Sequence, residues 1–189
     1  MMNNDVYAEC LVAKIPTTGD KVKKILLLVA MVVIGAFLLL FFGILGVMLD
    51  AAILYGGYYL FTGMDKEYEY IFTNGTLDID KISGQRSRKR MVSVDADTFT
   101  AFGKLSEAVD MAEGTTLVLA SAGNGGTDYY ADAKHKTAGN VRIIFTPNDK
   151  VIDGIAQFLP RQMRVKFMND RRAELAARGS EDKEESGEE

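Results

Sequence analysis

The chain has 189 residues, enough for one domain of ordinary size with additional segments. One cysteine and one histidine exclude an internal disulfide and a conventional zinc site made by a single chain. The net charge of −4 combines an acidic end (179–189) with a basic stretch (161–172), so it does not identify a partner. We expect no cofactor and no metal. We also expect no nucleic-acid partner, because no recognition motif accompanies the basic residues.

Residues 1–24 precede a long apolar segment and are expected to be cytoplasmic. Within 4–14, Val6, Tyr7, Cys10 and Leu11 recur at helical spacing. One interpretation is a short amphipathic helix at the membrane interface, with Cys10 as a candidate palmitoylation site. The alternative, which we favour, is a helix or strand packed on the domain that follows the apolar segment.

Residues 25–63 contain a single charged residue, Asp50. A helix needs about 20 apolar residues to cross a bilayer core about 30 Å thick, so this segment is too long for one crossing and fits two. The expected helices are 25–42 and 44–61, with the chain reversing around 42–46. A cleaved signal peptide is the rival interpretation, but its apolar region is only about 7–15 residues long. The sequence therefore predicts a two-helix transmembrane hairpin.

Basic residues lie on both sides of this hairpin and none lies in its far loop. The positive-inside rule then places both termini in the cytoplasm of a multi-pass protein of the cell membrane. The flanking residues are Lys14, Lys21, Lys23, Lys24, Lys66, Lys81 and the basic run at 86–90.

Asp50 is the most unusual residue of the hairpin, because acids within membrane helices are rare and often functional. Placed near the turn, its carboxylate lies about 9 Å along the helix from the far surface, at about 1.5 Å per residue. A proton or ion role would need an oligomer. We assign Asp50 no role from the sequence alone.

From Glu67 the hydrophobic period changes to that of strands. Segments 68–73 and 76–82 alternate apolar and polar residues, and Asn74-Gly75 between them is a strong hairpin signal because both turn positions need positive φ. Further strands are expected at 88–95, 99–102, 115–122, 128–135 and 140–146, with a helical turn or two at 104–114 and a hairpin turn at 123–126.

A closing helix is expected at about 147–159, capped by Thr146 and followed by Pro160. The fold class is thus a membrane α-hairpin plus an α+β domain over 65–167. In that domain, six or seven antiparallel strands form a barrel or sandwich closed by the helix. Residues 168–189 form a basic, then acidic tail, of which the last 11 are expected to be disordered.

The hairpin followed by Tyr68-x-Tyr70-x-Phe72-Thr73-Asn74-Gly75-x-Leu77 and a basic strand resembles the bacterial pleckstrin-homology-like (PH-like) membrane proteins. The resemblance is specific over about 67–95 and architectural over 115–160. It implies a PH-like barrel with a C-terminal helix, anchored at the cytoplasmic face. It implies no reaction.

Two basic runs are the candidate contacts for lipid or for a partner protein. The first comprises Arg86, Arg88, Lys89 and Arg90, and the second comprises Arg161, Arg164 and Lys166. Each cation near an anionic surface contributes roughly 1 kcal/mol. The alternative is a solvated strand edge whose charges discourage unwanted pairing and are neutralised by neighbouring acids.

We expect no enzyme, because no nucleophile motif accompanies His135 and no phosphate-loop ending follows the glycines at 123–126. The expected function is a membrane-anchored PH-like domain that binds the lipid surface or a protein. The alternative is a small accessory subunit of a larger membrane complex for transport or secretion. Expected partners are the bilayer, other membrane proteins or further copies of the chain.

Overall fold

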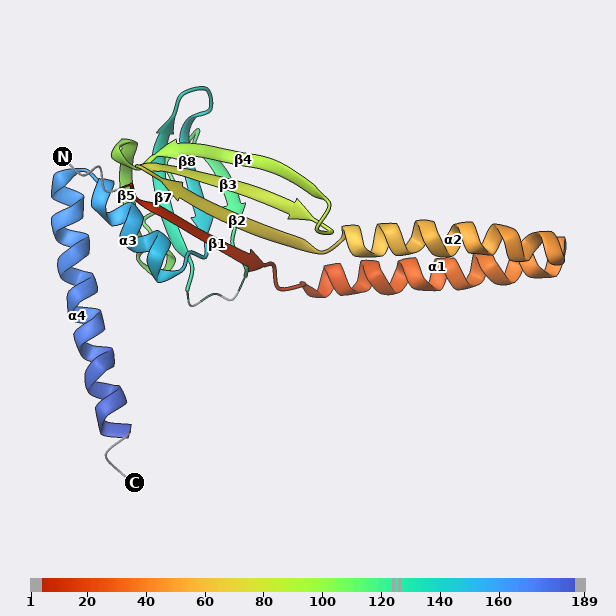
Figure 1. Ribbon diagram of the computed structural model, residues 1–189. Coiled ribbons are helices and arrows are strands. Elements are labelled where there is room, and N and C mark those ends of the chain that lie inside the picture. The colour runs from red at the N-terminus through yellow and green to blue at the C-terminus, as the bar shows by residue number, and fades with distance from the viewer. Residues whose placement is uncertain (1–4, 124, 126, 186–189) are drawn as a thin grey trace.

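The computed structural model describes residues 5–123, 125 and 127–185. Figure 1 shows a helical hairpin projecting from one end of a β domain, with the last helix on the opposite end. The chain passes through one strand, then the hairpin, then seven strands and two further helices.

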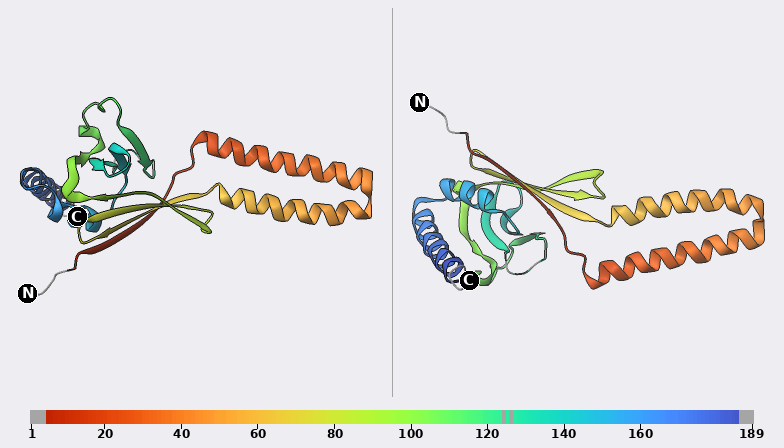
Figure 2. Two further views of the ribbon diagram at one scale, coloured as in Figure 1. Left: turned by 90° about the horizontal axis from the view of Figure 1, so that it is seen from above. Right: turned by 60° about the horizontal axis from the view of Figure 1, so that its bottom comes forward.

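The hairpin consists of α1 (Thr18–Phe42) and α2 (Ile44–Gly63), joined at Gly43, whose φ is 53°. Both are long and apolar enough to cross a membrane by length and composition. Helix α1 begins seven residues before the predicted start at 25, because Thr17 and Asp20 form a capping box ahead of the apolar run. Both views in Figure 2 show the two helices side by side along their length.

The first sheet is an antiparallel meander in the order β1-β2-β3-β4. Its strands are β1 (Tyr7–Ala13), β2 (Lys66–Thr73), β3 (Thr76–Ser83) and β4 (Ser87–Asp95). The predicted turn between β2 and β3 is confirmed, since Asn74 and Gly75 have φ of 47° and 100°.

The amphipathic-helix interpretation of residues 4–14 is wrong, because Tyr7–Ala13 is strand β1 and pairs with β2 along its whole length. The favoured alternative, a strand packed on the domain, is confirmed for these seven residues. Ala8 is buried and Cys10 and Val12 are half-buried on the side facing the core, while Tyr7 is exposed. This period of two satisfies a sheet and not a helix. The domain therefore begins before the hairpin, not at residue 65.

The helical hairpin takes the place of the turn that would join β1 to β2. Ala13 pairs with Glu67 at the end of the ladder, and the Lys14 N–H donates to the Lys66 carbonyl at 2.9 Å. The two strands thus deliver the two helices from adjacent positions. The hairpin is an insertion within the sheet, not an anchor attached before it.

The second sheet has the order β5-β7-β8-β6. Its strands are β5 (Phe99–Lys104), β6 (Thr116–Ala120), β7 (Tyr129–His135) and β8 (Gly139–Phe145). Strand β6 pairs with β8 in parallel, which corrects the prediction of an entirely antiparallel set. The loop at 121–128 is consequently a crossover and not the predicted hairpin turn. Between β5 and β6 only Leu105–Glu107 is helical, as a 3-10 turn.

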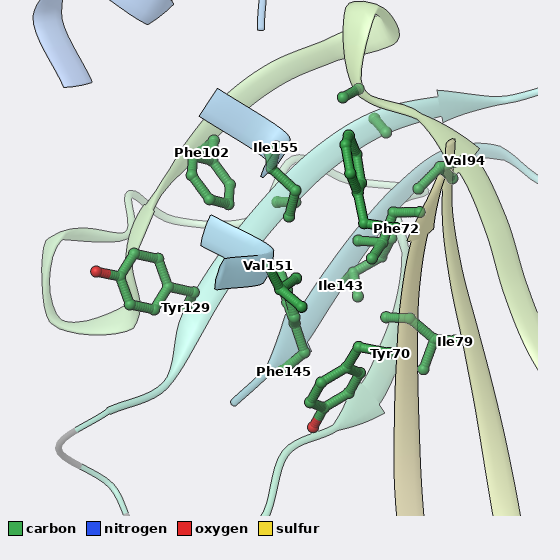
Figure 3. Close-up of a cluster of buried hydrophobic side chains, with 14 of the residues drawn as sticks. Tyr70, Phe72, Ile79, Val94, Phe102, Tyr129, Ile143, Phe145, Val151 and Ile155 are labelled. Atoms are coloured by element: carbon green, nitrogen blue, oxygen red, sulfur yellow. The ribbon is translucent and has the colours of Figure 1, made fainter. Parts of the chain in front are cut away.

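The core lies between the two sheets and under helix α3 (Asp149–Phe158). Figure 3 shows Tyr70, Phe72 and Ile79 of the first sheet facing Ile143 and Phe145 of the second, with Val151 and Ile155 of α3 above them. Among the described residues no hydrogen-bonded ladder joins the sheets, so the arrangement is an open sandwich covered by a helix.

Helix α3 is capped by Asn148, whose side chain accepts from the Val151 N–H at 2.9 Å. The predicted cap, Thr146, lies two residues earlier, and its hydroxyl instead donates to Asp128 at 2.6 Å. The buried carboxylate is the stronger acceptor and withdraws this hydroxyl from capping.

Helix α4 (Arg161–Glu185) follows Pro160 and corrects the predicted disorder of the tail as far as Glu185; residues 186–189 lie outside the described part of the chain. Arg171 binds Asp149 at 2.8 Å and Asp153 at 3.0 Å, and the Phe167 ring lies 4.9 Å from that of Phe102. These contacts fix the first half of α4, and the alanine- and glutamate-rich sequence beyond favours its continuation.

Candidate functional site

The junction between the hairpin and the first sheet is held on the α2 side by Arg86. Its guanidinium lies 3.9 Å over the Tyr59 ring, donates to the Tyr59 carbonyl at 2.9 Å and hydrogen-bonds the Thr62 hydroxyl. Gly84, at φ 58°, lets the β3–β4 turn approach α2 closely, since a Cβ there would lie 2.9 Å from the Thr62 carbonyl oxygen. The turn is therefore packed against the end of α2.

A second set of contacts ties α1 to the same junction. Lys24 binds Asp65 at 2.6 Å and lies 4.6 Å from the Phe61 ring centroid. Lys14 binds Asp20 at 2.9 Å, next to the capping box. Both connections between sheet and hairpin are thus fastened by charged side chains, so the hairpin has a defined direction relative to the sheet.

The basic strand β4 contains a β-bulge that decides which way its cations face. Ile79 pairs with Val92 but Asp80 pairs with Arg90, so Met91 is the extra residue. Strict alternation from Val92 would point Arg90 to the core, and the bulge turns it to the outer face instead.

On that outer face the arginines of the first predicted run meet acids. Arg88 binds Glu69 at 2.7 Å, and Arg90 binds Asp78 at 2.7 Å and also Asp80. Glu69 and Asp80 are buried, so the arginines neutralise carboxylates that the sheet would otherwise leave without a counter-charge. These two members of the run have a role within the sheet.

The opposite, inner face of the sheet gathers lysines at its hairpin end. Lys81 pairs with Tyr68 on one side and Lys89 on the other, while Lys66 lies two residues before Tyr68 and is bonded to Lys14 through the backbone. We call Lys14, Lys66, Lys81 and Lys89 the lysine cluster. Burial, and then the charges of the other three lysines, lower the pKa of the Lys81 ammonium. The other three ammonium groups therefore lie close enough to Lys81 to repel its charge.

The first predicted run is thus divided among three places. Within β4, Lys89 belongs to the lysine cluster and Arg88 and Arg90 to the outer face; Arg86, just before β4, belongs to the junction with α2. Lys14, Lys66 and Lys81 were noted in the sequence only for orientation. That these lysines lie together with Lys89 on one face could be predicted only if the pairing of β1 with β2 and the bulge in β4 were already known.

The second predicted run lies on α4, at the end of the domain away from the hairpin (Figure 1). Arg161 and Lys166 are exposed, and Arg164 donates to the Gln157 carbonyl at 3.0 Å. The structure therefore does not bring Arg161, Arg164 and Lys166 together with the residues of the first run.

Asp50 faces α1 within the hairpin. A Cβ built on Gly35 would lie 3.3 Å from Asp50 Oδ1, so only a small residue leaves room for the carboxylate there. Asp50 Oδ1 is buried and has no hydrogen-bond partner among the described residues. It also lines an apolar groove between the helices, together with Gly57 and Tyr58.

A network of buried polar side chains lies where the second sheet meets β2. Asp128 accepts from the hydroxyls of Ser121 at 2.7 Å and Thr146 at 2.6 Å, and Ala122 and Gly123 donate to those hydroxyls at 2.9 Å. Both carboxylate oxygens are thereby occupied, so the group fixes the crossover loop and offers no free base.

His135 and Cys10 are the remaining residues with reactive side chains. The His135 ring accepts from the backbone of its own turn, at 3.1 Å from the Ala138 nitrogen. Burial raises the pKa of the Cys10 thiol, which lies half-buried on β1. No group of three or more metal-ligating side chains occurs within the described residues.

Comparison with known proteins decides the family. The family model described as "Bacterial PH-like domain (DUF6106)" matches residues 4–165. The chain belongs to this PH-like family. The match runs from the segment containing β1, through the hairpin, into the first turn of α4, so the inserted hairpin lies inside the region that the family model matches. Among curated proteins and solved structures, none matches the chain significantly.

Proposed function

We propose that this protein is an integral membrane protein that holds a PH-like domain against the cytoplasmic face of the cell membrane, where the domain binds the lipid surface or another protein. The supporting observation is the insertion of two apolar helices between adjacent strands β1 and β2. A hairpin attached at both ends to one sheet sets the distance and direction of that sheet from the bilayer. The role is one of binding, without catalysis.

The proposal is tested by replacing the hairpin with a turn. Because Lys14 and Lys66 are adjacent at the end of the ladder, residues 15–65 can be exchanged for Asn-Gly, a pair that favours a two-residue turn. The full-length protein should stay in the membrane fraction after alkaline carbonate extraction, and the exchanged variant should be soluble. A full-length protein that is released by carbonate would refute the anchoring.

Orientation has its own test in a Cys10→Ser background. A cysteine at Ile44, beside the helix reversal, should react with an impermeant thiol reagent added outside intact cells. A cysteine at Lys136, in the β domain, should react only after lysis. The opposite pattern would place the domain outside the cytoplasm.

One observation favours a second candidate function, that of an accessory subunit in a membrane complex. The unpartnered Oδ1 of Asp50 lies in an interhelical groove, where a hydroxyl or basic group from another helix would satisfy it. Crosslinking in membranes followed by purification in mild detergent should then yield a stoichiometric partner, and Asp50→Leu should abolish its recovery. A monomer under both conditions counts against this function.

A further inference from the structure

The two faces of the first sheet differ in how their charges are balanced. On the outer face, Arg88 and Arg90 are each bonded to a carboxylate. On the inner face, the one acid bonded to the lysine cluster within the described residues is Asp20, which binds Lys14. The hairpin end of the inner face therefore has excess positive charge held by four adjacent strands.

The position of the lysine cluster limits what can neutralise it. The buried residues of the inner face end at Tyr68 on β2, Ile79 on β3 and Val92 on β4. The next inner positions toward the hairpin on these strands are Lys66, Lys81 and Lys89, which are half-buried or exposed. The cluster thus opens to solvent where the strands pass into α1 and α2. A ligand there would lie at the level of the headgroups of the bilayer that the hairpin enters.

An apolar surface begins at the same junction. A groove of about 400 Å³ between the domain-facing ends of α1 and α2 is lined by Lys21, Lys24, Ile25, Leu28 and Phe61. Lys21 and Lys24 bring ammonium groups to its lining, and the exposed apolar side chains of the hairpin continue from it along both helices. Cations beside an apolar groove match a ligand with an anionic head and hydrocarbon chains.

We propose that the lysine cluster binds the phosphate of an anionic phospholipid in the leaflet next to the hairpin, with the lipid chains lying along α1 and α2. This inference rests on the proposed membrane anchoring and adds the ligand class. A phosphate among the four ammonium groups offsets the repulsion that Lys81 feels from the other three, and the paired strands hold the four positions together before the lipid binds.

The test uses the full-length protein in detergent and native mass spectrometry. Phosphatidylglycerol should remain bound in preference to phosphatidylcholine. The pair Lys81→Gln and Lys89→Gln should weaken phosphatidylglycerol binding about thirtyfold, from roughly 1 kcal/mol for each lysine. The matched control removes two lysines near Asp95, at the far end of β4, by Lys134→Gln and Lys136→Gln, and should leave binding unchanged.

One further variant and one competitor complete the design. Lys81→Arg with Lys89→Arg keeps both charges and should keep binding, so a loss limited to the glutamine pair is not a folding defect. Excess glycerol phosphate should not displace the lipid, because it lacks the chains. Equal weakening by the two glutamine pairs, no preference over phosphatidylcholine, or displacement by glycerol phosphate would each overturn the proposal. A protein that resists carbonate extraction yet gives any of these results loses the lipid site alone and keeps the anchoring.

Discussion

The hydroxyl of Tyr70 joins the two sheets, and its removal gives the sharpest test of the packing. Tyr70 is fully buried on β2; its hydroxyl donates to the Ala120 carbonyl on β6 at 2.6 Å and accepts from the Thr146 N–H after β8 at 3.2 Å. Tyr70→Phe keeps the ring and deletes both bonds. The loss of buried hydrogen bonds should lower the free energy of unfolding by about 2 kcal/mol.

For a domain of this size, that change lowers the unfolding midpoint by roughly 8 °C. The assay exploits the single cysteine of the chain, Cys10, which is half-buried on β1 and should react with a fluorogenic maleimide when the sheet opens. Full-length protein in detergent is heated with the dye, and the midpoint of the fluorescence rise is read.

The matched control is Tyr68→Phe, the same chemical change two residues earlier on the same face. The described part of the chain supplies no hydrogen-bond partner for the Tyr68 hydroxyl, so its midpoint should move by less than about 2 °C. Equal shifts for the two variants would refute the reasoning, since the hydroxyl bridge would then contribute nothing beyond the ring.

Three further outcomes are expected. Burial raises the pKa of the Tyr70 phenol above its ordinary value, so the protonated phenol stabilises the fold fully below about pH 10, and this stabilisation is lost as the pH rises further. Above that pH the stability of the wild type, followed by circular dichroism, should fall more steeply than that of Tyr70→Phe. Ala8→Asp places a charge on the core side of β1 and should make the single thiol reactive at room temperature, whereas Tyr7→Asp on the exposed side should not. Asp132→Asn removes the counter-charge of the buried Arg142, which binds Asp132 at 2.6 Å and also donates to the Val109 carbonyl in the segment between β5 and β6. The free energy of unfolding should fall by about 3 kcal/mol, and limited proteolysis should cut that segment faster.

Local signals in the sequence were sufficient where neighbours in the chain are neighbours in space. The Asn74-Gly75 turn, the two apolar helices and the helix before Pro160 all follow from short-range patterns. That the apolar helices cross a membrane remains a prediction, as does lipid contact by the basic runs.

The errors involve partners that are distant in the sequence. Residues 4–14 are too short to separate a helix from a strand by period, and their partner β2 lies beyond the entire hairpin. The parallel pairing of β6 with β8 produces no pattern in the sequence of either strand that would distinguish it from antiparallel pairing. The extra residue at Met91 is also invisible to an alternation pattern, yet it decides which surface receives Lys89 and which receives Arg90.

The insertion of the hairpin between two paired strands has a consequence for biogenesis. Strand β1 leaves the ribosome first and has no partner until β2 follows the second helix. If both helices cross the bilayer, as we propose, β1 and β2 arrive on the same side and the ladder from Tyr7 to Ala13 can close. If only one helix inserts, the two strands are separated by the membrane and the sheet cannot form. Completion of the β domain thus reports that both helices have inserted, and a chain in which only one helix has inserted is left unfolded and open to proteolysis.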